Sequence, residues 1–173
     1  MLVHKLRARL RSIAIGKNTI IHDKPKLNCR LHNLMLENKP IDKLIFSHSD
    51  TDLSESFAPN SGRVFYINDK LSTPQAFIDF CNQNEIDSIL IEGGSEVYSW
   101  FLKNNLVDRV ILFYRPAFIG GDGLNVVKSQ NITEIAKLSD FNVVSTSVVA
   151  DNIMVDLYKK SDRKGEPLCL LDW

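Results

Sequence analysis

A short run around residue 92 holds the residues of this chain that are best suited to chemistry. Ile89–Ile91 is an apolar, branched segment that suits a strand buried on both faces, and Glu92 follows at its end. Gly93 and Gly94 then turn the chain, and Ser95 can cap a helix. Amides at such a turn and the positive end of the helix dipole point at one spot, so the run predicts a phosphate seat. A plain connecting turn is the alternative.

The elements that would position this run follow from apolar patterning. Short apolar runs predict strands at residues 13–15, 43–46, 63–67 and 107–114. Helices are expected over residues 3–9 and from Pro74, where Thr73 or Ser72 can cap the first turn. Residues 18–23 are expected to form a loop with a helical turn.

The end of the chain has a different pattern. Residues 141–150 and 152–158 alternate apolar and polar side chains, which predicts a terminal antiparallel hairpin that turns at Asp151 and Asn152. Strands separated by helices, followed by late strands, favour an α/β fold with a mixed sheet. We expect one domain over residues 1–160, followed by a tail at residues 161–173.

Composition narrows the classes of function. The 173 residues carry 21 Lys plus Arg and 21 Asp plus Glu, so the balanced charge predicts no nucleic-acid partner and no anionic membrane surface. No apolar run approaches the ~18 residues of a membrane span, and no secretory signal pattern is seen. The dispersed cysteines and histidines lack metal-ligand spacing, so no metal site is predicted. These features favour a cytoplasmic protein with reduced thiols.

Several segments in register resemble one family. Residues 6–9, 15–19 and 23–30 resemble the "LRA … GxxT … DDPxLTxR" signature of the riboflavin-biosynthesis reductase domain. Residues 89–95 resemble its "ILVEGGxT" element, and residues 106–121 resemble its "LVDExxxxxxPxxxGG" element. This domain is the C-terminal part of the bifunctional pyrimidine deaminase/reductase. The resemblance implies a three-layer, dihydrofolate reductase-like mixed sheet, usually in a homodimer.

The resemblance also implies an activity and a site. The family uses NADPH to reduce 5-amino-6-(5-phosphoribosylamino)uracil, a phosphoribosylamino-pyrimidine, to its ribityl form. Carried over residue by residue, the expected cofactor-binding residues are Thr19, Asp23, Ser47, Gly94, Ser95, Glu96, Val97, Tyr98, Ser99 and Trp100. The Ser47 position aligns loosely, so His48 and Ser49 are alternatives. The expected substrate-binding residues are Arg7, Leu27, Arg30 and Glu92, and Glu92 is also the expected catalytic residue.

The residue types fit this chemistry. Arg7 and Arg30 offer guanidinium forks for a ribose phosphate, although an isolated arginine usually covers the end of a helix or strand. Glu92 can accept hydrogen bonds from pyrimidine N–H groups or assist opening of the sugar ring; a solvated glutamate is the alternative. Asp23 could form only an Asx-turn before Pro25.

The sequence also departs from the family pattern. Lys24 replaces a second Asp, Asn28 and Cys29 replace a Thr-Val pair, and His22 replaces a small residue. Family members have a strand before the equivalent of Leu6, with a "KxAxSxDGK"-like run, and a zinc-binding deaminase domain; this sequence contains neither. Three hypotheses therefore stand: the reductase, an inactive remnant that binds a dinucleotide or a partner, and a pterin or folate reductase of similar fold.

Overall fold

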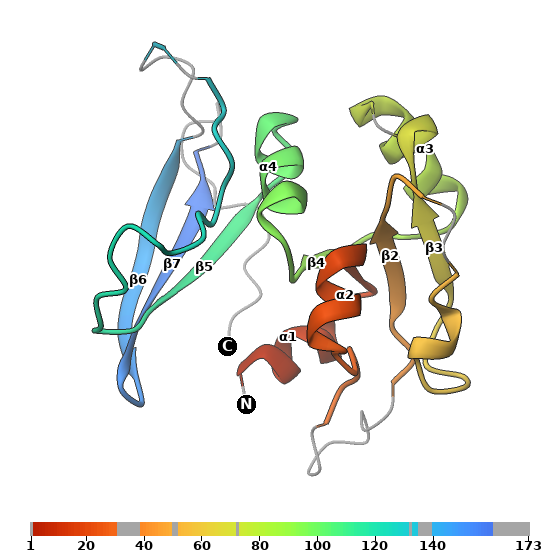
Figure 1. The fold of residues 1–173 in the computed structure, drawn as a ribbon, viewed down its shortest axis with the longest axis horizontal. Helices are drawn as coiled ribbons and strands as arrows, with labels where there is room; N and C mark the ends of the chain where they lie inside the picture. Colours follow the sequence, from red (N-terminus) through yellow and green to blue (C-terminus); the bar gives the residue numbers. More distant parts are fainter. Residues whose placement is uncertain are drawn as a thin grey trace. The chain divides into compact units, whose positions relative to one another are not determined.

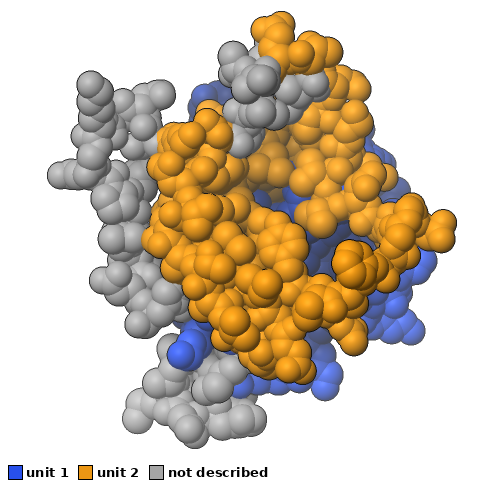
Figure 2. Space-filling view, turned by 90° about the vertical axis from the view of Figure 1, so that its left-hand side faces the viewer, with its two compact units in different colours: residues 1–98 blue, residues 99–173 orange. Residues whose placement is uncertain are grey.

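Strands and helices alternate through the first part of the chain, and further strands follow. The computed structural model describes residues 2–30, 39–49, 52–71, 73–131, 133–134 and 140–160. Contacts divide the chain into two compact units, residues 1–98 and 99–173, coloured blue and orange in Figure 2. The tail predicted at residues 161–173 lies outside the described residues. One domain over residues 1–160 stays a prediction.

A parallel sheet forms the centre of the first unit (Figure 1). Its described strands are β1 (Ser12–Gly16), β2 (Asp42–Phe46), β3 (Val64–Ile67) and β4 (Ile89–Ile91), in the order β3-β2-β1-β4. Three of them confirm the strands predicted at residues 13–15, 43–46 and 63–67, with slightly different ends. The central strands are buried, since Ile13, Ile15 and Leu44 are at most 1% exposed, as expected for a parallel sheet covered on both faces.

Helices connect these strands. The described helices are α1 (Leu2–Arg9), α2 (Lys17–Asp23), α3 (Pro74–Gln83) and α4 (Ser95–Lys103), with short 3₁₀ turns η1 (Ser54–Ser56) and η2 (Asp69–Leu71). The predicted cap of α3 is confirmed, because the Thr73 side chain accepts a hydrogen bond from the Ala76 amide at 3.3 Å. None of the described helices is long and apolar enough to cross a membrane.

Two local predictions were right only in part: residues 18–23 were expected to be mostly loop with a helical turn, and Ile89–Ile91 forms the expected strand, β4, but was expected to be buried on both faces. Residues 18–23 belong to the helix α2, which Ile20 anchors in the core and Lys24 ends in a left-handed conformation. Two apolar residues were too weak a pattern to indicate this helix. Ile89–Ile91 is only partly buried, because β4 has β1 as its one neighbour in the described part of the sheet.

The second unit contains an antiparallel sheet. Its described strands are β5 (Arg109–Tyr114), β6 (Phe141–Val149) and β7 (Asn152–Lys159), in the order β5-β7-β6. The predicted hairpin is confirmed as β6 and β7, although its turn is at Ala150 and Asp151, one residue earlier than predicted. The strand predicted at residues 107–114 begins at Arg109, whose guanidinium group binds the buried Asp156 carboxylate at 2.6 and 2.8 Å.

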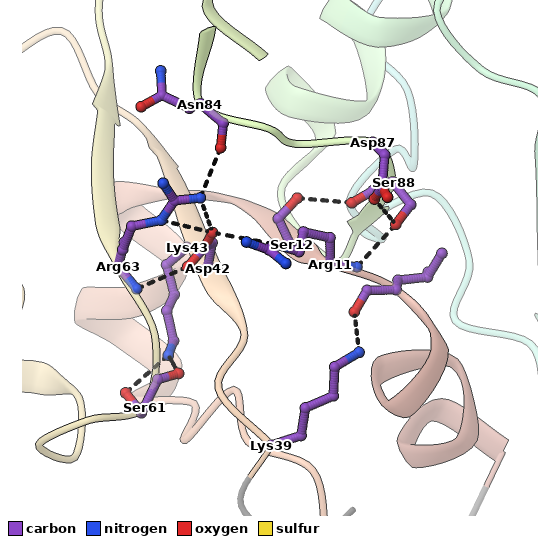
Figure 3. A network of polar contacts seen from close by, with 11 residues as sticks. Arg11, Ser12, Lys39, Asp42, Lys43, Ser61, Arg63, Asn84, Asp87 and Ser88 are labelled. Carbon is purple, nitrogen blue, oxygen red and sulfur yellow. Dashed lines mark hydrogen bonds and ion pairs between the residues drawn. The ribbon is translucent and has the colours of Figure 1, made fainter. Parts of the chain in front are cut away.

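A polar network holds the amino ends of β1 and β2 (Figure 3). Asp42 accepts hydrogen bonds from the Arg63 side chain at 2.6 and 3.0 Å. Burial tends to raise the pKa of Asp42, but the bonds from Arg63 lower it overall. Lys43 is fully buried and donates to Ser61 Oγ at 2.8 Å and to the Ser61 carbonyl. Burial lowers the pKa of Lys43 to about 8.

Candidate active site

The strand order places a natural binding position between β1 and β4. From β1 the sheet extends to β2 and β3 on one side and to β4 on the other. Because all these strands are parallel, their carboxyl ends lie at one edge, and the chain crosses from β1 to β2 on one side and later enters β4 on the other side of β1. Open α/β sheets bind their ligands at such a switch point. Lys17 follows β1 there, and Glu92 follows β4.

The diglycine turn packs closely against α2 at this position. A Cβ atom on Gly93 would lie 3.2 Å from Ile15 Cγ1 and 3.2 Å from Thr19 Cγ2. Gly94 has a φ of +78°, and its Cβ would lie 3.4 Å from Thr19 Oγ1. Glycine is therefore favoured at residue 93 by close approach and at residue 94 by the left-handed backbone. The fold brings together Thr19 and Gly94, two residues predicted to bind the cofactor.

Helix α4 starts directly after this turn. The Tyr98 amide donates a hydrogen bond to the Gly94 carbonyl at 3.1 Å. Ser95 is therefore the first helical residue, and the prediction that it caps the helix was wrong. The early amides of a helix have no acceptor within it and favour anions. Val97 is buried, whereas Glu96 is exposed. Burial raises the pKa of Tyr98, and the nearby Glu92 carboxylate raises it further.

The other predicted cofactor residues lie on nearby elements or in the second unit. Asp23 is the exposed last residue of α2, one turn beyond Thr19 on the same helix face. Ser99 and Trp100 continue α4 and belong to the second unit. Ser99 Oγ accepts a hydrogen bond from the Lys128 amide at 2.7 Å, and the Trp100 ring packs edge-to-face on Phe101.

Two predicted substrate residues form an ion pair. Arg7 Nε lies 2.6 Å from Glu92 Oε1, and Arg7 Nη2 donates to Glu92 Oε2. The third Arg7 contact runs from Nη1 to the Asn28 carbonyl at 2.9 Å. The two side chains are only 10% and 15% exposed. Arg7 thus fixes the orientation of Glu92 and links it to the segment that carries Leu27 and Arg30.

That segment has an unusual backbone. Leu27 has a φ of +46° although it is not glycine, and its side chain is 1% exposed. Such strained residues persist where the surroundings hold them, which is frequent at functional sites. Asn28 Oδ1 is buried with no hydrogen-bond partner among the described residues. Arg30 is exposed and therefore accessible to a ligand.

A third group lies beyond the end of β2. Ser47 is buried, and its hydroxyl donates to the Ser49 carbonyl at 2.7 Å and accepts from the Ser49 amide at 3.1 Å. Lys17 Nζ donates to Ser49 Oγ and so brings a positive charge to this turn. Lys17 was not predicted as a site residue, because nothing in the local sequence indicates that the start of α2 reaches residue 49.

Other features of the first unit lie apart from these groups. A groove of about 340 Å³ is lined by none of the predicted site residues; its lining is Ile20, Ile21, Lys24, Pro25, Leu53 and Ser56. Within the described ranges, no group of three His, Cys, Asp or Glu side chains is arranged to hold a metal ion. The candidate active site therefore consists of the carboxyl ends of β1 and β4, the Arg7–Glu92 pair and the turn after β2.

Comparisons with known proteins identify the family. The model of the RibD C-terminal domain matches residues 1–155. The chain belongs to this family. The solved structure of RibD from Acinetobacter baumannii is similar in fold, with a TM-score of 0.73 and 20% identity, over 91% of this chain and 49% of that chain. The predicted α/β, dihydrofolate reductase-like fold is thereby confirmed.

Curated relatives of the RibD family are similar along most of the chain. "Riboflavin biosynthesis protein RibD" of Chlamydia trachomatis is 23% identical over 177 residues, covering 87% of this chain and 47% of that protein. "5-amino-6-(5-phosphoribosylamino)uracil reductase" of Buchnera aphidicola is 26% identical over 148 residues, covering 68% of this chain and 72% of that protein. The chain thus spans about half the length of the RibD relative.

Proposed function

We propose that this chain is an NADPH-dependent reductase of 5-amino-6-(5-phosphoribosylamino)uracil in riboflavin biosynthesis. Membership of the RibD C-terminal domain family and the name of the Buchnera relative support this reaction. The observation that carries the proposal is the Arg7–Glu92 ion pair, which joins two predicted substrate residues beside the diglycine turn. A carboxylate of fixed orientation next to a dinucleotide seat is what a positioned hydride transfer needs.

The glycines at the β1–β4 edge support a dinucleotide there. A Cβ atom on Gly94 would meet only Thr19 Oγ1 among the described residues, so the backbone there is open to a ligand, and the first amides of α4 start beside it. A pyrophosphate would rest on the backbone at Gly94 and Ser95, with Thr19 against its neighbouring groups. The residues present therefore fit a nicotinamide dinucleotide, which supplies a hydride when bound.

Lys17 supports the choice of NADPH over NADH. In sheets of this strand order the turn after the second strand holds the adenosine ribose, where an acid favours the 2′-hydroxyl and a cation favours a 2′-phosphate. That turn contains Ser47, His48 and Ser49, and Lys17 Nζ contacts Ser49 Oγ. A phosphate at this turn would accept hydrogen bonds from the ammonium and hydroxyl groups.

Glu92 and the arginines would act on the pyrimidine substrate. Arg30 is exposed and can bind the ribose 5-phosphate, whereas the Arg7 fork orients Glu92. We assign to the Glu92 carboxylate the transfer of the glycosylamine N–H proton to the ribose ring oxygen, as the C1′–O4′ bond breaks and a C1′=N imine forms. A bound nicotinamide dinucleotide would supply the hydride to C1′ of this imine, and a proton on the nitrogen would complete the ribitylamino product.

Binding and turnover by the purified chain test this proposal. NADPH binding is followed by nicotinamide fluorescence, and turnover by loss of NADPH absorbance with the pyrimidine substrate. We expect a micromolar Kd and measurable turnover. Binding without turnover would favour the alternative, an inactive remnant that binds a dinucleotide or a partner. Absence of both would contradict the proposal.

We also propose that the chain forms a homodimer through its antiparallel sheet. Tyr114, Ile153 and Val148 are paired across β5, β7 and β6, so they share one face, and all three are exposed. β6 lies at the edge of the described sheet and contains no charged residue. Proteins usually protect such edges with charges or cover them, and a second copy would cover this one.

The free thiols of Cys29 and Cys81 suit a reducing compartment, so we place the protein in the cytoplasm.

A further inference from the structure

Three consecutive residues of the substrate segment are tied to α1. The Asn28 carbonyl accepts a hydrogen bond from Arg7 Nη1 at 2.9 Å. Cys29 Sγ donates to the His4 carbonyl at 3.5 Å, and the Arg30 amide donates to His4 Nδ1 at 3.2 Å. Helix α1 therefore holds residues 28–30 through the side chains of Arg7 and His4 and through the His4 carbonyl.

These hydrogen bonds hold a strained backbone segment in place. Leu27 adopts the left-handed region, with a φ of +46°, and its side chain is fully buried. A leucine in this conformation is strained and relaxes unless its neighbours are held. The residues that follow, up to the exposed Arg30, must therefore be fixed from outside the segment, and His4 provides the last fixed point.

The bond to His4 also determines the state of its ring. Accepting a hydrogen bond uses the lone pair of Nδ1, so the ring proton is on Nε2 and the imidazole is neutral. Burial lowers the pKa of His4, and the positive charges of Arg7 and Arg30 lower it further. The acceptor at Nδ1 is thereby retained near neutral pH.

We propose that His4 is a positioning residue for substrate binding, and that its Nδ1 atom fixes the Arg30 backbone so that the Arg30 side chain meets the substrate phosphate. The inference rests on the proposed function, in which Leu27 and Arg30 face the substrate. It adds to that function a residue that touches neither substrate nor cofactor. His4 acts through the backbone of residue 30, whereas Arg7 acts through Asn28 and Glu92.

Two substitutions separate this role from simple packing. His4→Asn places an amide oxygen at the same number of bonds from the backbone as Nδ1, so it can keep the bond to Arg30. His4→Leu fills similar space without an acceptor. Lys5→Leu, at an exposed neighbouring position of α1, is the matched control. Steady-state kinetics, NADPH binding and hydrogen exchange of the Arg30 amide are measured for each full-length variant.

We expect His4→Leu to raise KM for the pyrimidine substrate about tenfold, the effect of one lost hydrogen bond, with kcat and the NADPH Kd within about twofold. Exchange at Arg30 should accelerate in His4→Leu, and His4→Asn should restore both KM and exchange. Unchanged exchange in His4→Leu, or faster exchange with unchanged KM, overturns the inference. If the wild-type chain neither binds nor reduces the substrate, the proposed function itself fails, and the inference fails with it. If the wild type is active and His4→Leu is equally active, only the role of His4 is contradicted.

Discussion

Arg7 and Glu92 are 85 positions apart in the sequence, yet Arg7 Nε lies 2.6 Å from Glu92 Oε1 and both side chains are largely buried. The pair connects α1, at the start of the chain, to the turn that follows β4. It therefore places a carboxylate of defined orientation beside Gly93 and Gly94. Removing either partner should affect both stability and catalysis.

We expect Arg7→Met and Glu92→Met each to lower the free energy of unfolding by about 3 kcal/mol, because each leaves a buried charge without its partner. The double variant should be less destabilised than the sum of the two, with an interaction of about 2 kcal/mol. Urea denaturation of the four proteins measures this cycle. Additive losses would show that the pair contributes no coupling.

Gly94→Asp should weaken NADPH binding at least about tenfold, because a carboxylate would lie where we propose that the pyrophosphate rests. Gly94→Asn is the matched control, since asparagine has nearly the same shape, lacks the charge and tolerates a positive φ. The Kd of each variant is measured by nicotinamide fluorescence. Equal affinities in the two variants would rule out the anion seat at Gly94.

Arg30→Ala should raise KM for the pyrimidine substrate at least about tenfold, through loss of a charged hydrogen bond to phosphate. The NADPH Kd should change less than about twofold, because Arg30 is on the segment after α2 and not on the diglycine turn. Lys26→Ala, another exposed cation of the same segment, serves as the control. Equal losses of substrate and cofactor affinity would contradict the assignment of Arg30.

Lys43 should make stability depend on pH. Its folded pKa of about 8 lies below the ordinary value of 10.5. Between these values the unfolded chain binds the proton and the folded chain does not, so the free energy of unfolding rises with pH. We expect a gain of about 3 kcal/mol from pH 8 to pH 10.5 in the wild type relative to Lys43→Met. Parallel pH profiles of the two proteins would refute this expectation.

Val148→Lys should dissociate the proposed homodimer, because it places a charge on the apolar face shared with Ile153 and Tyr114. Ser147→Lys adds the same charge on the opposite face of β6, so it is the control. Sedimentation velocity distinguishes monomer from dimer. A dimer that survives both substitutions would assign the interface to another surface, and a monomeric wild type would exclude it.

Local sequence determined the features that depend on near neighbours. Around Glu92 a strand, a diglycine turn and the helix α4 follow one another. Branched residues favour the strand, and the glycines permit the tight turn from which α4 begins. The cap at Thr73 and the β6–β7 hairpin were predicted for the same reason, since their signals span only a few residues. α2 was missed because its apolar pattern is too short.

Tertiary structure alone decided which distant residues meet. The contacts of Arg7 with Glu92, His4 with Arg30 and Lys17 with Ser49 depend on the order and register of parallel strands. Parallel strands are joined by long crossovers, so no short-range pattern records which strand ends become neighbours. The sequence could supply the residue types of this site, and only the packed sheet could pair them.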